Sequence, residues 1–448
     1  MKNSLFVMAA FCAILSACAE MFRDGDRVAF VGDSITHMGY YVRIISDYYV
    51  TRFPDKDIKL FQIGQGGSRA KHCLQWCQQM VVSKKPNVVA VMFGMNDIGR
   101  KDYVAQPSQE QVESQKKSLD EYARSMRELT RLIDAKLGNP RRYFLTPTPY
   151  FDAADKRAGT QNQMGVNAGL AAASAIVRDE WREHGGTLVD FNAAYNSFFR
   201  EWRGPDDRQI TGWDRIHPLE GGHLLMAYWF LKAQNADRIV SDIRLHGNRV
   251  VCAINADVTD LAATKGYVSF TVLEKALPMP FLPGDSAKVQ KMLPLAEELN
   301  QEVLTFYPPQ DGEWLLKIDG RDIVKASEKK WIKGINIAFN EKTPQFEQAQ
   351  RVAEANKTFR DLVRSVQSTW KGQENFIRHE LKKRAEDPMA RAELIAGLPS
   401  NRQKQLSFIL ENWDHKAELE EKAIEGGAEI RKLAKPCPHR YELVLINK

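Results

Sequence analysis

Four short clusters in the first half of the chain contain the residue types that acyl transfer requires. They are residues 32–34 (Gly-Asp-Ser), 64–68 (Gly-Gln-Gly-Gly-Ser), 94–97 (Gly-Met-Asn-Asp) and 214–218 (Asp-Arg-Ile-His-Pro). A serine hydroxyl acts as a nucleophile when a nearby base accepts its proton. A histidine can be that base, and a carboxylate can fix its tautomer and stabilise its charged form. The clusters therefore predict a serine-dependent acyl-transfer site.

Individual roles follow from the chemistry of each group. Ser34 is the candidate nucleophile, and Asp214 and His217, three residues apart, can supply the carboxylate and the base from one loop. The oxyanion of a tetrahedral intermediate needs preorganised hydrogen-bond donors. The candidates are the backbone N–H groups of Ser34 and Gly67 and the side-chain amide of Asn96. A glycine at position 67 would let the backbone approach the substrate closely.

Each cluster also has a purely structural interpretation. Asp33 and Ser34 suit the N-cap of a helix, and Asn96 could cap the segment that follows it. The glycines fit neither a dinucleotide-binding fingerprint nor a Walker motif. His217 and His223 lack acidic or cysteine partners at metal-ligand spacing, so neither a metal nor a cofactor is expected. The serine does not lie in a G-x-S-x-G elbow, which argues against an α/β-hydrolase fold.

Five further residues near the clusters are candidates for contact with the substrate. They are Asp33, His37, Arg69, Tyr150 and Trp213. His37 follows Ser34 by three residues and could reach a bound ester, although a surface position explains it equally well. The others are expected to line the pocket around the scissile bond.

The elements that must position these residues alternate between short apolar runs and amphipathic stretches. Strands are expected at residues 28–32, 58–63, 88–93, 143–147 and 187–191. Strand–helix alternation predicts an α/β domain with a parallel sheet covered by helices on both faces. Three of the clusters directly follow a predicted strand, so the sheet would bring them together at its carboxyl edge.

The second half of the chain no longer alternates between strand and helix patterns. Residues 245–340 contain several strand patterns and a hairpin signal at Asp319-Gly320, which predict a small β-rich module, with a helix expected at 288–301. Residues 341–448 predict a helical hairpin whose second helix covers 402–435, followed by a last strand that returns to the small sheet.

In their order and spacing, the four clusters resemble the SGNH hydrolases, the GDSL-type esterases and lipases. The resemblance covers about half of the chain, and the predicted SGNH hydrolase domain spans residues 22–244. It implies a flavodoxin-like three-layer domain with Ser34 as nucleophile, His217 as base and Asp214 as its partner. It also implies an oxyanion hole formed by Ser34, Gly67 and Asn96.

Two positions depart from the family pattern. Ile35 replaces the leucine of Gly-Asp-Ser-Leu, and Gln62 stands near the glycine loop where the family usually has asparagine. The second departure leaves Gly66 as an alternative to Gly67 for the oxyanion donor.

Composition and charge restrict the functional classes. The chain has 448 residues, 44% of them hydrophobic and 27% charged, as expected for two or three domains with a sizeable core. The net charge of +6 comes without a concentrated basic block, so nucleic-acid binding has no support. Cys252 and Cys437 could pair in an oxidising compartment.

The first twenty residues predict export. Lys2 precedes an apolar run at residues 5–15, and small residues follow, as in a secretory signal peptide (residues 1–20). Residues 15–18 resemble a bacterial lipobox, which would make Cys18 a lipidated N-terminus, whereas Ala17-Cys18-Ala19 offers conventional cleavage. The protein is therefore expected in the periplasm, outside the cell or on the outer surface.

Taken together, the sequence predicts an exported serine esterase that acts through an acyl-enzyme. Similar secreted bacterial proteins remove acetyl groups from polysaccharides, so the expected substrate is an acetylated glycan. A lipase or lysophospholipase is the alternative within the class, and a non-catalytic glycan-binding scaffold is the alternative outside it.

Overall fold

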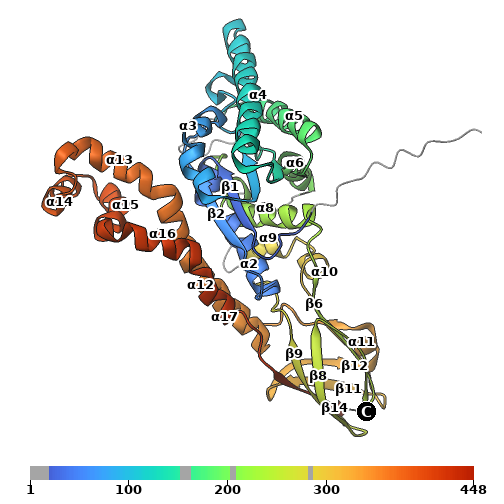
Figure 1. Cartoon of the computed structure of the whole chain (residues 1–448). Helices are drawn as coiled ribbons and strands as arrows, with labels where there is room; N and C mark the ends of the chain where they lie inside the picture. The colour runs from blue at the N-terminus through green and yellow to red at the C-terminus, as the bar shows by residue number, and fades with distance from the viewer. Residues whose placement is uncertain (1–19, 152–162, 202–207, 281–285, 448) are drawn as a thin grey trace, which may run out of the picture.

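The computed structural model describes residues 20–151, 163–201, 208–280 and 286–447, which form three parts (Figure 1). We call them the sheet domain, built on strands β1 to β5; the β module, built on strands β6 to β14; and the arm, helices α12 to α17. The predicted signal peptide up to residue 19, with Cys18, lies outside the described residues. None of the described helices combines the length and apolar character needed to cross a membrane.

The sheet domain has a five-stranded parallel sheet in the order β2-β1-β3-β4-β5. Its strands are β1 (Arg27–Gly32), β2 (Lys59–Gly64), β3 (Val88–Met92), β4 (Arg141–Leu145) and β5 (Thr187–Val189). In the register of the sheet, Gly32 lies opposite Gly64 on one side and Met92 on the other. This confirms the predicted α/β class, and it sets the first three clusters level with one another at the carboxyl edge.

Helices cover both faces of the sheet. Helix α2 (Tyr40–Arg52) packs against α8 (Glu220–Ala233), while α3 (Ala70–Met80), α4 (Gln109–Leu137) and α5 (Val166–His184) form the other layer. Shorter helices are α1 (Ser34–Met38), α6 (Phe191–Glu201) and α7 (Arg208–Thr211). The continuous apolar runs of the central strands are buried between the layers, as a parallel sheet covered on both faces requires.

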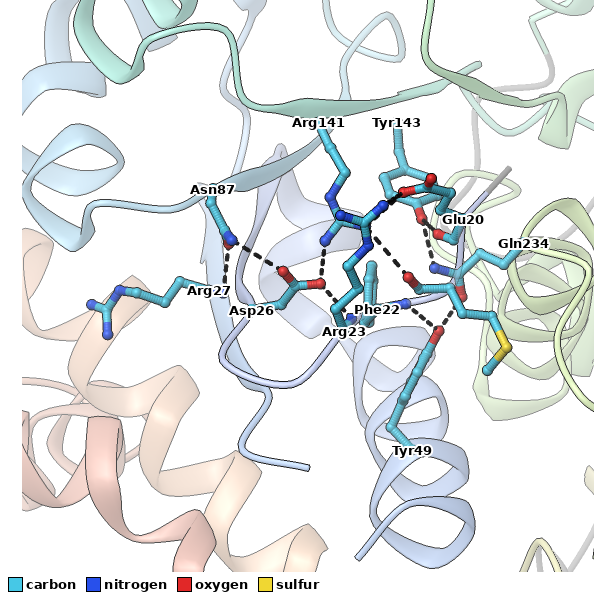
Figure 2. Close-up of polar contacts among 11 residues, drawn as sticks. Glu20, Phe22, Arg23, Asp26, Arg27, Tyr49, Asn87, Arg141, Tyr143 and Gln234 are labelled. Carbon is cyan, nitrogen blue, oxygen red and sulfur yellow. Dashed lines mark hydrogen bonds and ion pairs between the residues drawn. The ribbon is translucent and has the colours of Figure 1, made fainter. Parts of the chain in front are cut away.

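The first described residues are held at the opposite, amino edge of the sheet (Figure 2). Asp26 is 2% exposed, accepts a 3.0 Å hydrogen bond from the Asn87 side chain and pairs with Arg141. The backbone N–H of Phe22 donates to the Tyr49 hydroxyl over 3.0 Å. The chain therefore enters the domain at the edge opposite the four clusters.

The β module consists of two sheets with strand orders β13-β10-β6-β7 and β12-β11-β14-β9-β8. Their strands are β6 (Ile239–His246), β7 (Arg249–Ile254), β8 (Ala256–Ala263), β9 (Tyr267–Glu274), β10 (Gln301–Tyr307), β11 (Glu313–Ile318), β12 (Arg321–Ser327), β13 (Ile335–Asn336) and β14 (His439–Asn447). Helix α11 (Glu328–Lys333) follows β12. The last strand β14 pairs with β9 and β11, so the chain end does return to this module.

Three expectations for the second half need correction. Strand β6 begins at Ile239, so the module starts before the expected boundary at residue 245. The helix expected at 288–301 is instead two short helices, α9 (Ser286–Gln290) and α10 (Leu295–Glu298), because Pro294 cannot continue a helix. Cys252 and Cys437 are free cysteines and do not form the expected disulfide. Cys252 lies on β7, and Cys437 precedes β14 in the other sheet, with its Sγ 3.5 Å from His439 Nε2.

The arm begins with a long helix that leads away from the β module, and several shorter helices lead the chain back. Its elements are α12 (Pro344–Arg364), the π-helical turn η3 (Ser365–Thr369), α13 (Trp370–Leu381), α14 (Pro388–Ala396), α15 (Ser400–Glu411), α16 (Lys416–Glu425) and α17 (Gly427–Leu433). The single helix expected over 402–435 is wrong. It is divided at Asn412 and at the Gly426-Gly427 pair, residues that favour helix ends.

Figure 1 shows the arm, coloured orange to red, running from the β module along the β2 side of the sheet domain. Its contacts there are buried and polar. Asn356 Nδ2 donates to Asp47 Oδ1 over 2.7 Å, and the Arg360 guanidinium donates to the Leu60 carbonyl over 2.7 Å. Because Leu60 lies on the edge strand β2, the arm covers an edge that would otherwise be open to pairing with another chain.

Docking of the arm should depend on pH through Asp47. Burial raises the pKa of Asp47 to about 7, against the opposing effects of the Asn356 hydrogen bond and of the Arg43 and Arg360 charges. The folded state therefore binds this proton more tightly than the unfolded chain, and stability should fall as the pH rises from the ordinary value of 3.8 to about 7. We expect Asp47→Asn, which keeps an acceptor for Asn356, to raise Tm by several degrees at pH 8 and hardly at pH 4. Thermal unfolding of both proteins across this range is the measurement, and an equal difference at every pH would contradict it.

Candidate active site

The Ser34, His217 and Asp214 side chains form a continuous hydrogen-bonded series. Ser34 is the first residue of α1, directly beyond the carboxyl end of β1. Its Oγ lies 2.7 Å from His217 Nε2, and His217 Nδ1 lies 2.5 Å from Asp214 Oδ2. The structure thus brings together residues that are separated by about 180 positions in the chain. The arrangement is that of a nucleophile, its base and the acid that orients the base.

The loop that carries the acid and the base is fixed in an unusual conformation. Asp214 Oδ1 accepts the backbone N–H groups of Ile216 and His217 at 3.0 and 2.9 Å. Arg215 has a φ of 67° although it is not glycine, and its fully buried guanidinium donates to the Phe151 carbonyl over 2.9 Å. A side chain at Gly212 would come within 1.8 Å of the His217 carbonyl oxygen. The loop therefore tolerates little movement of the imidazole.

Electrostatics keep Asp214 ionised. Partial burial would raise its pKa, but hydrogen bonds from the His217 side chain and from the N–H groups of His217 and Ile216 lower the pKa to about 2. A carboxylate only accepts hydrogen bonds, so Nδ1 of His217 must carry the proton. The lone pair of Nε2 then faces Ser34 Oγ and is able to accept its proton.

The predicted oxyanion donors converge from three strand ends. Gly67 has a φ of 69°, the left-handed region that favours glycine, and its N–H has no partner within the described parts of the chain. Asn96 Nδ2 donates to the Ser68 carbonyl in the same glycine loop over 3.1 Å. The Arg100 guanidinium donates to Asn96 Oδ1 over 3.1 Å, which fixes the rotation of the amide with its Nδ2 toward that loop.

Two buried aspartates support these loops from behind. Asp97 accepts the N–H groups of Ala70 and Gly94 at 2.8 and 2.9 Å, which ties the second and third clusters together. Asp33 is 1% exposed, and its Oδ1 accepts the Ile35 N–H over 3.0 Å. Asp33 is therefore the N-cap of α1 and out of reach of a substrate, a correction to its expected role. Its burial raises its pKa to about 6.

A cavity of about 430 Å3 opens beside the Ser34, His217 and Asp214 series, with Asp214 in its wall. Its walls include Gly67, Arg69, Asn96, Arg100, Tyr150 and Asp214. Arg69 and Tyr150 therefore line the cavity, as expected of residues that contact the substrate. Trp213 is 62% exposed and is not part of this wall, and His37 faces a different groove, lined in part by the arm.

Arg100 is the site residue that the sequence reasoning missed, although its position four residues after Asn96 was a usable signal. Replacing it by methionine should release the Asn96 amide and reduce kcat about tenfold to a hundredfold with little change in KM, since losing one oxyanion donor outright costs about 10²–10³ in kcat. Steady-state kinetics on p-nitrophenyl acetate measure kcat and KM separately. Arg124→Met, on the exposed face of α4, is the control. A wild-type kcat for the Arg100 variant would contradict this role.

His223, also considered as a metal ligand, is a packing residue. It is fully buried, and its Nδ1 accepts the Tyr41 N–H over 3.3 Å while its ring stacks on that of Tyr41. Burial, with the nearby Arg43 and His217 charges, lowers its pKa to about 3, so the ring is neutral. It packs in the core beneath α2 through Tyr41.

Comparison with known proteins gives a consistent result. Residues 30–225 match the model of the GDSL-like lipase/acylhydrolase family. An acetylxylan esterase from Geobacillus stearothermophilus is 24% identical over 226 residues, which cover 46% of this chain and 93% of that protein. A crystal structure of an acetylxylan esterase from the same organism is 22% identical, with a TM-score of 0.39 over 48% of this chain and 96% of the other.

One solved structure is similar over nearly the whole length. It is a gut microbial diltiazem-metabolizing enzyme, 26% identical, with a TM-score of 0.79 and coverage of 96% of this chain and 99% of that one. The similarity therefore extends beyond the sheet domain to the β module and the arm.

Proposed function

We propose that this chain, whose residues 30–225 match the GDSL-like lipase/acylhydrolase family, is a serine carboxylic ester hydrolase that deacetylates carbohydrates through an acyl-serine intermediate. The observation that carries the mechanism is the series of two short contacts, 2.7 Å from Ser34 Oγ to His217 Nε2 and 2.5 Å from Nδ1 to Asp214.

In the first half-reaction, Ser34 Oγ attacks the carbonyl carbon of the ester while His217 Nε2 takes the hydroxyl proton. The carbonyl oxygen becomes an oxyanion, which the N–H groups of Ser34 and Gly67 and the Asn96 amide stabilise. The imidazolium is stabilised by the Asp214 carboxylate. It then gives its proton to the alcohol oxygen as the carbon–oxygen bond breaks, which leaves an acyl-Ser34 ester and a free alcohol.

In the second half-reaction, water takes the place of the alcohol. His217 Nε2 removes a proton from the water as its oxygen attacks the acyl carbon, and the same oxyanion donors act again. Collapse of this intermediate breaks the bond to Ser34 Oγ, which regains the proton from His217. The products are the carboxylic acid and the original enzyme.

The character of the cavity supports a short acyl group over a fatty one. Its wall is rich in charged and polar side chains, including Arg69, Arg100, Lys101 and Gln163. A long acyl chain gains its binding energy from apolar surface, and the largely apolar side chains in this wall are Tyr150 and Ile216. The acetylxylan esterase among the relatives adds support for an acetylated glycan.

Export is part of the proposal and rests on the predicted signal peptide. Cleavage before Cys18 would give a lipoprotein, and cleavage at Ala17-Cys18-Ala19 would give a soluble exported enzyme. The scaffold alternative is disfavoured because a binding protein has no need of three hydrogen-bonded catalytic groups.

Substrate preference tests the proposal. The ratio of kcat/KM for p-nitrophenyl acetate to that for p-nitrophenyl decanoate should be well above one, and acetate should be released from acetylated xylooligosaccharides. A preference for the decanoate would instead support a lipase, and a folded protein with no esterase activity would support the scaffold. Diltiazem belongs in the same panel, because the relative that is similar over the full length is a diltiazem-metabolizing enzyme.

A further inference from the structure

A polar groove of about 740 Å3 lies between the sheet domain and the arm. His37, Gly66 and Gln75 line it on one side, and Arg364, Gln373 and Asn375 on the other. His37 is one helical turn after Ser34 on α1, and Gly66 directly precedes the predicted oxyanion donor Gly67. The groove therefore adjoins the loops that carry Ser34 and Gly67, and none of its described lining residues is shared with the 430 Å3 cavity.

The arm is a fixed wall of this groove. Gln367 Oε1 accepts the Gln62 N–H of the edge strand β2 over 3.0 Å in a buried contact. With the Arg360–Leu60 and Asn356–Asp47 contacts described above, this makes three polar contacts that hold α12 and η3 against the sheet domain. Both walls of the groove thus keep their spacing without a bound ligand.

The π-helical turn lies at the point where the arm meets the groove. Gln367 of this turn reaches the sheet, and Thr369, two residues later, lines the groove. A π-helical turn replaces the regular α-helical hydrogen bonds by i→i+5 bonds, and such turns are found frequently at functional sites. Its position here allows the same helix to dock on β2 and to present polar residues to the groove.

The chemistry of the lining suits a neutral, polyhydroxylated molecule. Carboxamide side chains come from both walls, among them Gln75, Gln373 and Asn375, and each carries donors and an acceptor. Arg364 is paired with Asp361 at 3.0 Å. Burial lowers the pKa of His37, and the Arg364 charge lowers it further, so the imidazole is neutral. With Arg364 paired and His37 neutral, the groove lining has little net charge to favour an ionic ligand over a neutral one.

We propose that this groove is the sugar subsite of the enzyme, which binds the neutral oligosaccharide that carries the scissile ester, with the arm as one of its two walls. The inference rests on the proposed carbohydrate esterase function and assigns a role to a region outside the family domain. An ester seated at Ser34 would extend its alcohol half past His37 and Gly66, between α3 and the arm.

Substitutions on both walls test the subsite. Gln75→Ala and Asn375→Ala should each lower kcat/KM for acetylated xylotetraose, relative to that for p-nitrophenyl acetate, by about three- to tenfold, the effect of one hydrogen bond. The double variant should lower this ratio by about tenfold to a hundredfold. Calorimetric titration of the wild type with unacetylated xylotetraose should show binding, and the double variant should bind it more weakly by a similar factor.

Matched controls come from α3 and from another helix of the arm. Gln78→Ala on α3 and Asn401→Ala on α15 are exposed and outside the groove, and both should keep the wild-type ratio. An unchanged ratio and unchanged xylotetraose binding in the double variant would overturn the subsite, while acetate release by the wild type would leave the proposed function standing. If the wild type hydrolyses p-nitrophenyl acetate but not acetylated xylotetraose, the proposed function fails, and the calorimetric comparison alone still decides the subsite.

Discussion

Replacing Ser34 by alanine is expected to lower kcat for p-nitrophenyl acetate by about 10⁴- to 10⁶-fold, because it removes the hydroxyl that faces His217 Nε2, the proposed nucleophile. His217→Ala should cause a loss of the same order. The double variant should lose little more than either single one, since nucleophile and base act as a unit. KM should change little, because neither variant removes a wall of the cavity.

The measurement is steady-state hydrolysis by the wild type, both single variants and the double variant. Ser83→Ala, an exposed serine beyond the end of α3, is the control and should keep wild-type kinetics. Undiminished hydrolysis by the Ser34 variant would refute the mechanism. Strictly additive losses would show that Ser34 and His217 do not act in one step.

Asp214→Asn is expected to have the second largest effect, a loss of about 10³- to 10⁴-fold in kcat. The asparagine can donate a hydrogen bond to His217 Nδ1, which would place the imidazole proton on Nε2. The lone pair that should accept the Ser34 proton would then be lost. Steady-state kcat and KM report the effect, and a wild-type kcat would show that the 2.5 Å contact has no catalytic importance.

The same aspartate gives a pH signature. Its folded pKa of about 2 lies below the ordinary 3.8, so its contribution to stability is present above pH 3.8 and is lost as the pH falls toward 2. Across pH 4 to 9 it remains a carboxylate, and the activity profile in that range should not report its titration. Any fall in activity on the acid side of that range should therefore report a group other than Asp214, and a wild-type pH profile of kcat from pH 4 to 9 is the measurement.

The sequence was most informative where a local pattern decides the structure. Apolar runs of β1, β2 and β3, each ending at a polar cluster, predict both the parallel sheet and the common edge on which the clusters meet. The three-residue spacing of Asp214 and His217 fits a single loop, and the structure shows that loop held by Asp214 itself. These features depend on neighbours in the chain.

Features that depend on tertiary packing could not be predicted in this way. The positive φ of Arg215 is stabilised by its contact with Phe151, 64 residues away. The arm reaches the catalytic edge because Gln367 meets the backbone of Gln62, a contact across 305 residues that no periodicity indicates. Strand β6 is defined by its pairing with β10 and β7, so its start at Ile239 cannot be read from the composition of residues 239–244.

The most direct test of the central claim is covalent labelling with a fluorophosphonate probe, followed by intact-mass measurement and peptide mapping. The account predicts one adduct per chain, located on the Ser34 Oγ. The adduct should be absent from Ser34→Ala, slower to form in His217→Ala, and retained in Ser83→Ala. An adduct on another residue, or labelling of Ser34→Ala at the wild-type rate, would contradict the assignment of Ser34 as the nucleophile.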